Sequence, residues 1–183
     1  MLLSGIGLKY DIIDADADES SVSKEGIEPN IYVQELALLK AAAAAKKLDK
    51  KKNAIIISAD TVVVLDGKIL GKPKDEGDAF SMLSSLSGRT HDVYTGYCIM
   101  RPEDGTAVCK SVRTAVTFKT LSEDKIRRYI ATDEPMDKAG AYGIQDKGAA
   151  LVEKIDGDYF NVVGLPVSAL ADTMEKEFNI NIL

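Results

Sequence analysis

The order of apolar and polar positions along the chain predicts helices that alternate with strands and hairpins. Apolar runs rich in β-branched residues are typical of strands, and apolar residues three or four positions apart are typical of helices. The expected strands are 10–13, 55–64, 68–70, 93–100, 108–118 and 149–155. The expected helices are 29–48, 75–86, 167–178 and one that begins at Ser122. This alternation favours an α/β or α+β fold with a mixed sheet.

The expected helix 29–48 carries a lysine close to its apolar face. Its apolar positions are Val33, Leu36, Ala37, Ala41 and Ala44. Lys40 comes four residues after Leu36 and three after Ala37, so we expect its side chain to point toward that inner face.

Asp60 is a lone carboxylate within the apolar strand expected at 55–64. An ionised carboxylate is costly to bury unless a cation, a metal or hydrogen-bond donors face it. A helix N-cap or a bulge that turns the side chain out of the sheet is an alternative interpretation. The hairpin signal Asp66-Gly67 and the cation Lys72 follow closely, which favours a functional site.

Composition and charge are those of a soluble globular protein. The 183 residues are 45% hydrophobic and 28% charged, and 23 basic against 29 acidic residues give a net charge of -6. An acidic chain of this kind argues against nucleic-acid binding. Its densest basic patch, Lys46-Lys47 with Lys50 to Lys52, suits a helix end and a solvated turn. We expect a single domain over 1–183.

Neither the cysteines nor the apolar runs indicate a metal scaffold, a disulfide framework or a membrane span. Cys98 and Cys109 have no histidine at metal-ligand spacing, so two reduced thiols are expected. Apolar runs are shorter than the ~20 residues needed to cross a bilayer, and the N-terminus does not read as a signal peptide. We therefore expect a cytoplasmic protein.

Four polar clusters could carry chemistry. They are Asp18-Glu19, Asp60-Thr61, Lys72 and the stretch 138–145. Two separated carboxylates without a His/Cys cluster suit a hard cation such as Mg²⁺. Lysines near such a cation suit a polyphosphate ligand, because they neutralise charge on its oxygens. The chain has neither a Walker A motif nor a dinucleotide fingerprint, so its pattern is not that of an ordinary kinase, ATPase or dehydrogenase.

The one histidine, His91, and the aromatic residues near the chain's end have structural as well as functional interpretations. The sequence has no Ser or Cys nucleophile motif that His91 could activate as a general base. This favours a structural role in which His91 makes a hydrogen bond. Tyr142, Tyr159 and Phe160 could stack on a base or could form the rim of the core.

Five motifs in order resemble the Maf family of nucleoside triphosphate pyrophosphatases. They are Ser58-Ala59-Asp60-Thr61-Val62-Val63, Gly71-Lys72-Pro73, Leu86 to Gly96, Asp137 to Gln145, and Gly157 to Pro166. The resemblance runs from about Leu2 to the C-terminus. It implies an elongated α/β fold of two lobes around a mixed sheet, like that of the inosine triphosphate pyrophosphatases.

The resemblance also implies roles for particular residues. Asp60 would accept a proton and adjoin a divalent cation, Mg²⁺ or Mn²⁺, with Glu19 as a second neighbour of that cation. Lys40, Lys72 and Lys138 would meet the phosphates of a nucleoside triphosphate. Thr61 and Gln145 match the subgroup that acts on dTTP and UTP, and Gln145 can offer both a donor and an acceptor to a pyrimidine edge.

The chain departs from the family pattern at its start. The family begins with a strand and a Ser-x-x-Pro-Arg-Arg turn into a helix, whereas Met1 to Gly7 looks like the end of that helix. That turn would hold the triphosphate through amides and guanidinium groups. A start that lies upstream, a shortened protein and a catalytically impaired form are all open interpretations.

The leading hypothesis is a metal-dependent pyrophosphatase that converts dTTP, UTP or modified pyrimidine nucleotides to the monophosphate and pyrophosphate in a house-cleaning role. The alternative is a catalytically impaired nucleotide-binding regulator associated with cell division or septum formation. A homodimer is expected from the family resemblance alone.

Overall fold

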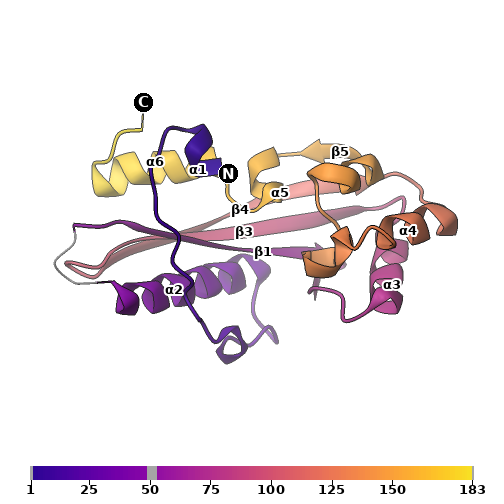
Figure 1. Ribbon diagram of the computed structural model, residues 1–183, viewed down its shortest axis with the longest axis horizontal. Helices are drawn as coiled ribbons and strands as arrows, with labels where there is room; N and C mark the ends of the chain where they lie inside the picture. Colours follow the sequence, from indigo (N-terminus) through magenta and orange to yellow (C-terminus); the bar gives the residue numbers. More distant parts are fainter. Residues whose placement is uncertain (1, 49–52, 183) are drawn as a thin grey trace. The chain divides into compact units, whose positions relative to one another are not determined.

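The computed structural model describes residues 2–48 and 53–182 (Figure 1). The strands are β1 (Ile56–Leu65), β2 (Lys68–Leu70), β3 (Thr90–Arg101), β4 (Thr106–Phe118) and β5 (Val152–Asp156). The α-helices are α1 (Leu2–Gly5), α2 (Pro29–Lys47), α3 (Glu76–Leu86), α4 (Glu123–Ile130), α5 (Tyr159–Val163) and α6 (Val167–Phe178). The 3₁₀ turns are η1 (Glu19–Ser21), η2 (Glu134–Asp137), η3 (Ala139–Ala141) and η4 (Asp146–Leu151).

The strands form one five-stranded sheet in the order β2-β1-β3-β4-β5. β1 and β2 pair antiparallel across the Asp66-Gly67 turn, and β4 and β5 also pair antiparallel. Figure 1 shows β3 running opposite to both β1 and β4. The predicted α/β fold with helices flanking a sheet is confirmed, but its sheet is antiparallel where we expected a mixed one. The reason is that β1 lies between β2 and β3 in the sheet. The helix α3 connects β2 to β3, so the two strands that it joins are not neighbours and the connection creates no parallel pair.

The chain divides into two compact units. The first consists of residues 1–60, 95–112 and 164–183, and the second of 61–94 and 113–163. β1, β3 and β4 each contribute residues to both units, and the boundary within β1 falls between Asp60 and Thr61.

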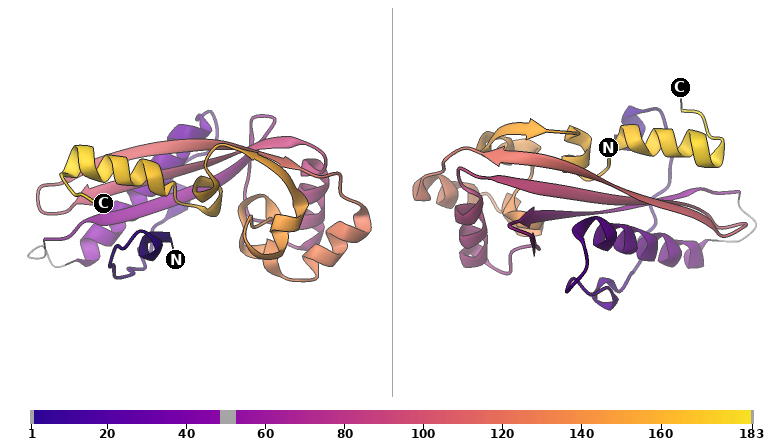
Figure 2. Two further views of the ribbon diagram at one scale, coloured as in Figure 1. Left: turned by 90° about the horizontal axis from the view of Figure 1, so that it is seen from above. Right: turned by 180° about the vertical axis from the view of Figure 1, so that it is seen from behind.

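In the first unit, α2 and α6 cover opposite faces of the strands (Figures 1 and 2). Successive side chains of a strand point to opposite faces, and the two clusters follow this alternation. Ile56 and Cys98 pack with the alanines of α2, whereas Tyr97 and Ile99 pack with Leu170 and other residues of α6.

The helix α2 approaches β3 at Gly96, which has no side chain to hold the two elements apart. A Cβ at Gly96 would lie 2.3 Å from the carbonyl carbon of Val33, closer than real Cβ atoms come to other heavy atoms. Ser58 of β1 adds a second link, since its Oγ donates to the carbonyl of Ala37 at 2.6 Å. The apolar face of α2 therefore lies directly on the strands, as the sequence predicted.

In the second unit, α3 and α4 pack with the strand ends and with η3 around one apolar core. α3 contributes Leu83 and Leu86, which are fully buried, and α4 contributes Ile126 and Tyr129. Asp75 and Ser122 cap these helices by accepting hydrogen bonds from Asp78 N and Lys125 N. Such caps satisfy the first amides of a helix, and both helix starts were predicted from these residues.

Most predicted elements are confirmed, and three predictions need comment. Residues 10–13 form no strand, because Ile12 is 73% exposed and the segment joins no ladder in the described chain. The strand expected from Ala149 begins at Val152, because η4 occupies the preceding residues. Lys46 and Lys47 lie in the last turn of α2, as expected, while Lys50 to Lys52 lie outside the described residues.

Among the described helices, none is long and apolar enough to cross a membrane.

Candidate active site

In the first unit, Lys40 binds two carboxylates that come from separate parts of the chain. Its Nζ lies 2.6 Å from Oδ1 of Asp60 on β1 and 2.9 Å from Oε1 of Glu19 on η1. The side chains of Lys40 and Asp60 are 25% and 15% exposed, and that of Glu19 is 54% exposed. The sequence-based expectation that Lys40 points inward is confirmed, and its ammonium is a cation that faces the Asp60 carboxylate.

The two carboxylates favour the charged form of Lys40. Burial alone would lower the pKa of Lys40, but hydrogen bonds to Asp60 and then Glu19 raise it above its ordinary value. Tyr32 lies two helical turns before Lys40 on α2, and burial, followed by the two carboxylates, raises its pKa. Tyr32 was not predicted as a site residue, although its spacing of eight from Lys40 places both on one helix face.

The carboxylates of Glu19 and Asp60 fit a divalent cation that also binds phosphate. Both reach the same ammonium within 3 Å, so their oxygens converge on one point. Within the described residues, no three His, Cys, Asp or Glu side chains gather into a metal-binding group. Mg²⁺ is commonly held by one or two carboxylates together with substrate phosphates and water, so a pair of carboxylates is a sufficient protein contribution.

In the second unit, four predicted residues line a single cavity of about 250 Å³. They are Thr61, Lys72, Lys138 and Gln145. Valine, isoleucine and tyrosine side chains form much of the remaining wall, including Val63, Val93, Tyr142 and Ile144. An apolar wall with a few polar groups is typical of a pocket for a small ring-shaped ligand.

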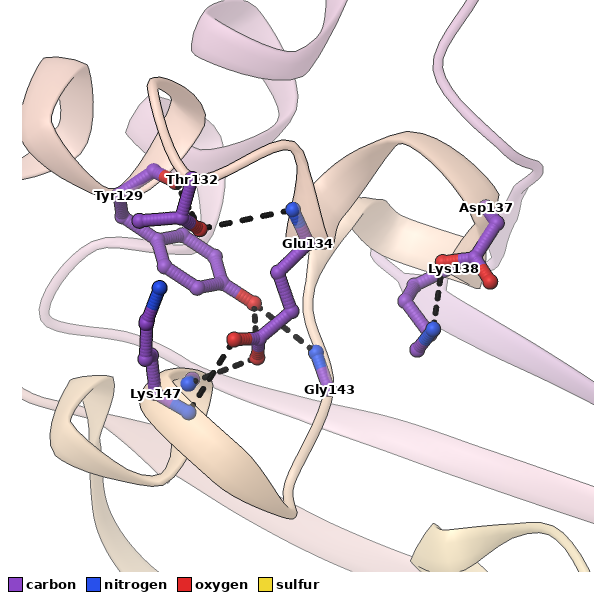
Figure 3. Close-up of polar contacts among 8 residues, drawn as sticks. Tyr129, Thr132, Glu134, Asp137, Lys138, Gly143 and Lys147 are labelled. Atoms are coloured by element: carbon purple, nitrogen blue, oxygen red, sulfur yellow. Dashed lines mark hydrogen bonds and ion pairs between the residues drawn. The ribbon is translucent and has the colours of Figure 1, made fainter.

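Asp137 lines this cavity together with the two lysines and was not predicted as a site residue. Lys138 Nζ donates to Oδ1 of Asp137 (Figure 3). This hydrogen bond first, and the charge of Lys72 to a smaller extent, hold the pKa of the Asp137 carboxyl below its usual value. A phosphate that binds either lysine would have to compete with this carboxylate.

Glu134 and Tyr129 form a hydrogen-bonded network beside the same cavity (Figure 3). Tyr129 Oη donates to Glu134 Oε1 at 3.0 Å and accepts from the amide of Gly143 at 3.1 Å. Glu134 Oε1 accepts from the amide of Gly148 at 2.9 Å, and Oε2 accepts from that of Lys147 at 3.1 Å. Sequence reasoning missed both residues, since a glutamate before a proline and a tyrosine near a helix end carry no distinctive signal.

The predicted site residues thus fall into two groups. Glu19, Lys40 and Asp60 are in direct contact in the first unit. Thr61, Lys72, Lys138 and Gln145 line the cavity of the second unit. Asp60 and Thr61 are chain neighbours on β1, and their side chains belong to different groups because side chains alternate along a strand.

Comparison with known proteins identifies the family. The model of the family described as "Maf-like protein" matches residues 1–177. This chain belongs to the Maf family. It is 50% identical over 182 residues to a dTTP/UTP pyrophosphatase of Thermoanaerobacter sp. (strain X514), covering 100% of this chain and 93% of that protein. A dTTP/UTP pyrophosphatase of Clostridium novyi (strain NT) is 51% identical over 169 residues, covering 92% of this chain and 87% of that protein.

Proposed function

We propose that this chain is a nucleoside triphosphate pyrophosphatase that acts on dTTP and UTP with a divalent cation, Mg²⁺ or Mn²⁺. The observation that carries the proposal is the contact of Lys40 with both Asp60 and Glu19, which assembles two carboxylates and a cation in the first unit. The names and the identity of the relatives support the same substrate class.

The proposed reaction is attack of water on the α-phosphorus. The water oxygen forms a bond to the α-phosphorus, the bond from that phosphorus to the α–β bridging oxygen breaks, and pyrophosphate leaves. A divalent cation, when bound, would polarise water and neutralise phosphate charge. Glu19 and Asp60 would hold it, and a carboxylate oxygen of Asp60 would take the proton that the water loses.

The remaining residues would bind substrate. Lys72 and Lys138 would neutralise charge on the phosphate oxygens, which is worth most when charge develops on the leaving pyrophosphate. Lys40 would orient the Asp60 carboxylate and contribute to phosphate binding. Gln145 and Thr61 would face the pyrimidine, and the apolar wall of the cavity would accommodate the ring.

The direct test is the release of monophosphate and pyrophosphate from dTTP and UTP in the presence of Mg²⁺ or Mn²⁺. Asp60→Asn should lower kcat by at least about a hundredfold, because the amide does not accept the proton. Asp66→Asn is the matched control, since Asp66 is an exposed carboxylate in the turn after the same strand and pairs with Arg89. Equal activity of Asp60→Asn and the parent would refute the mechanism. Nucleotide binding without turnover by the parent would favour the regulatory alternative.

A further inference from the structure

The loop that carries Gln145 is fixed on both sides by two side chains. On one side the Gly143 amide donates to Tyr129 Oη, and on the other the Lys147 and Gly148 amides donate to the Glu134 carboxylate. Gln145 lies between these anchors and is exposed. The loop backbone therefore has three hydrogen bonds to side chains within six residues.

The anchors are themselves tied to the core of the second unit. Tyr129 is 5% exposed and packs in the main apolar cluster of that unit. Burial raises the pKa of its hydroxyl, so the group stays protonated and can donate to Glu134 while it accepts from Gly143. A buried residue of the core is thus linked through one hydrogen bond to Glu134 and through another to the loop.

The loop also has little room to move at its second anchor. A Cβ at Gly148 would lie 2.1 Å from the carbonyl oxygen of Gly143 and 2.6 Å from Tyr129 Oη. Asp146 adopts a left-handed backbone conformation with φ of 47°. Such a conformation is costly for a residue with a side chain and persists where surrounding contacts impose it.

We infer that Tyr129 and Glu134 are positioning residues that set how sharply the chain distinguishes thymine and uracil from cytosine. The inference rests on the proposed function. Thymine and cytosine present opposite hydrogen-bonding groups at C4, an acceptor oxygen and a donor amine. A glutamine amide carries both a donor and an acceptor and can turn to pair with either. Gln145 alone does not select one base, so selection needs its backbone to be held in place by other groups.

The principal variant is Tyr129→Phe, which removes one hydroxyl and keeps the buried ring. The Gly143 amide then loses its acceptor, and we expect its hydrogen exchange in the ligand-free protein to become faster. The ratio of kcat/KM for dTTP to that for dCTP should fall about fivefold, which is the scale of one lost hydrogen bond. The kcat for dTTP should change by less than about twofold, because the chemical groups are untouched.

A double-mutant cycle with Gln145→Ala separates positioning from general weakening. If Tyr129 acts through Gln145, then Tyr129→Phe should not lower the dTTP to dCTP ratio further once Gln145 is alanine. Additive losses in the two single variants and the double variant would overturn the inference. So would an unchanged ratio in Tyr129→Phe.

Two further variants keep the result interpretable. Glu134→Gln retains one acceptor oxygen, so its dTTP to dCTP ratio should fall less than that of Glu134→Ala. This comparison of two Glu134 variants tests the inference even if Tyr129→Phe folds poorly. Tyr97→Phe is the matched control, because Tyr97 is a buried tyrosine of the first unit whose hydroxyl donates to Ala169 O at 2.9 Å. It should leave the base ratio unchanged.

Failure of the proposed function and failure of this inference give different experimental results. A parent protein that hydrolyses neither dTTP nor UTP overturns the proposed function, and exchange of the amides from Gly143 to Gly148 then tests the anchoring by itself. Faster exchange in both the Tyr129 and Glu134 variants supports the anchoring, and unchanged exchange overturns it. A parent that hydrolyses dTTP, with variants that keep its base ratio, overturns the inference alone.

Discussion

Lys40 Nζ lies 2.6 Å from Oδ1 of Asp60, and the same ammonium lies 2.9 Å from Oε1 of Glu19. A helix, a strand and a 3₁₀ turn thus bring one cation and two anions to a single point. An ammonium in this position competes with any divalent cation for the same carboxylate oxygens. Removing the lysine charge should therefore expose a cation site that the parent protein partly masks.

We predict that Lys40→Gln makes the melting temperature depend more strongly on Mg²⁺ than in the parent. Without the ammonium the two carboxylates repel each other, and a divalent cation that binds only the folded protein offsets this repulsion. The measurement is the melting temperature over a Mg²⁺ titration without nucleotide. Lys47→Gln is the control, because Lys47 is on the same helix and pairs with the exposed Asp16. Equal Mg²⁺ responses in parent and variant would contradict the prediction.

The sequence could predict that Asp60 and Lys40 each make a polar contact, because each prediction rests on a short segment of the chain. A carboxylate in an apolar run and a lysine three or four residues from buried helix positions both indicate a polar contact on an inner face. That Lys40 and Asp60 bind each other is a tertiary contact across 20 residues, which the sequence pattern did not specify. The absence of a strand at 10–13 has the same origin, since a strand needs a partner edge that local pattern does not reveal.

The close packing around Gly148 predicts a strong effect of one methyl group. Gly148→Ala would place a Cβ against Gly143 O and Tyr129 Oη, so either the loop shifts or Tyr129 moves. We expect a loss of about 2 kcal/mol in the free energy of unfolding and a raised KM for dTTP. Gly5→Ala is the control, because a Cβ there has no heavy atom within 4 Å. Denaturant titration and steady-state kinetics measure both effects, and a Gly148→Ala protein that matches the control in both would refute the packing argument.

The two lysines of the cavity predict a salt-dependent affinity for nucleotide. Lys138→Gln should raise the KM for dTTP about tenfold, the scale of a lost charge-assisted hydrogen bond. Its KM should also vary less between low and high salt, because one charge that salt screens is gone. Lys68→Gln provides the comparison, since Lys68 is exposed on β2 and outside the cavity wall. A Lys138→Gln protein with parental KM at all salt concentrations would remove Lys138 from the proposed binding group.

The cavity illustrates where sequence reasoning reaches its limit. Lys72, Lys138 and Gln145 could be named as candidates because they lie in ordered motifs that resemble those of the Maf family. Glu134 could not, because its role depends on backbone amides 13 and 14 residues further along the chain. Any residue has such amides, so their partners become visible only when the loop geometry is known.

His91 predicts a pH dependence of stability that a variant can isolate. It is 3% exposed, its Nε2 lies 2.8 Å from Tyr142 Oη, and Phe118 packs edge-on against its ring at 5.1 Å between centroids. These contacts support the structural role that the sequence favoured. Its Nδ1 has no hydrogen-bond partner in the described structure, so a second proton there would be buried without an acceptor. Burial accordingly lowers the pKa of His91 to about 4.

The sign of the effect follows from the lowered pKa. The unfolded chain takes up a proton near pH 6.5 and the folded chain only near pH 4. The stabilising contribution of neutral His91 is therefore complete above pH 6.5 and is lost as the pH falls toward 4. The loss is on the order of 3 kcal/mol. We predict that the free energy of unfolding of the parent falls more steeply over this range than that of His91→Gln. Urea titrations at several pH values measure the free energy of unfolding of both proteins. The contributions of the carboxylates, which both proteins share, cancel in the difference between them. Parallel pH profiles would contradict the prediction.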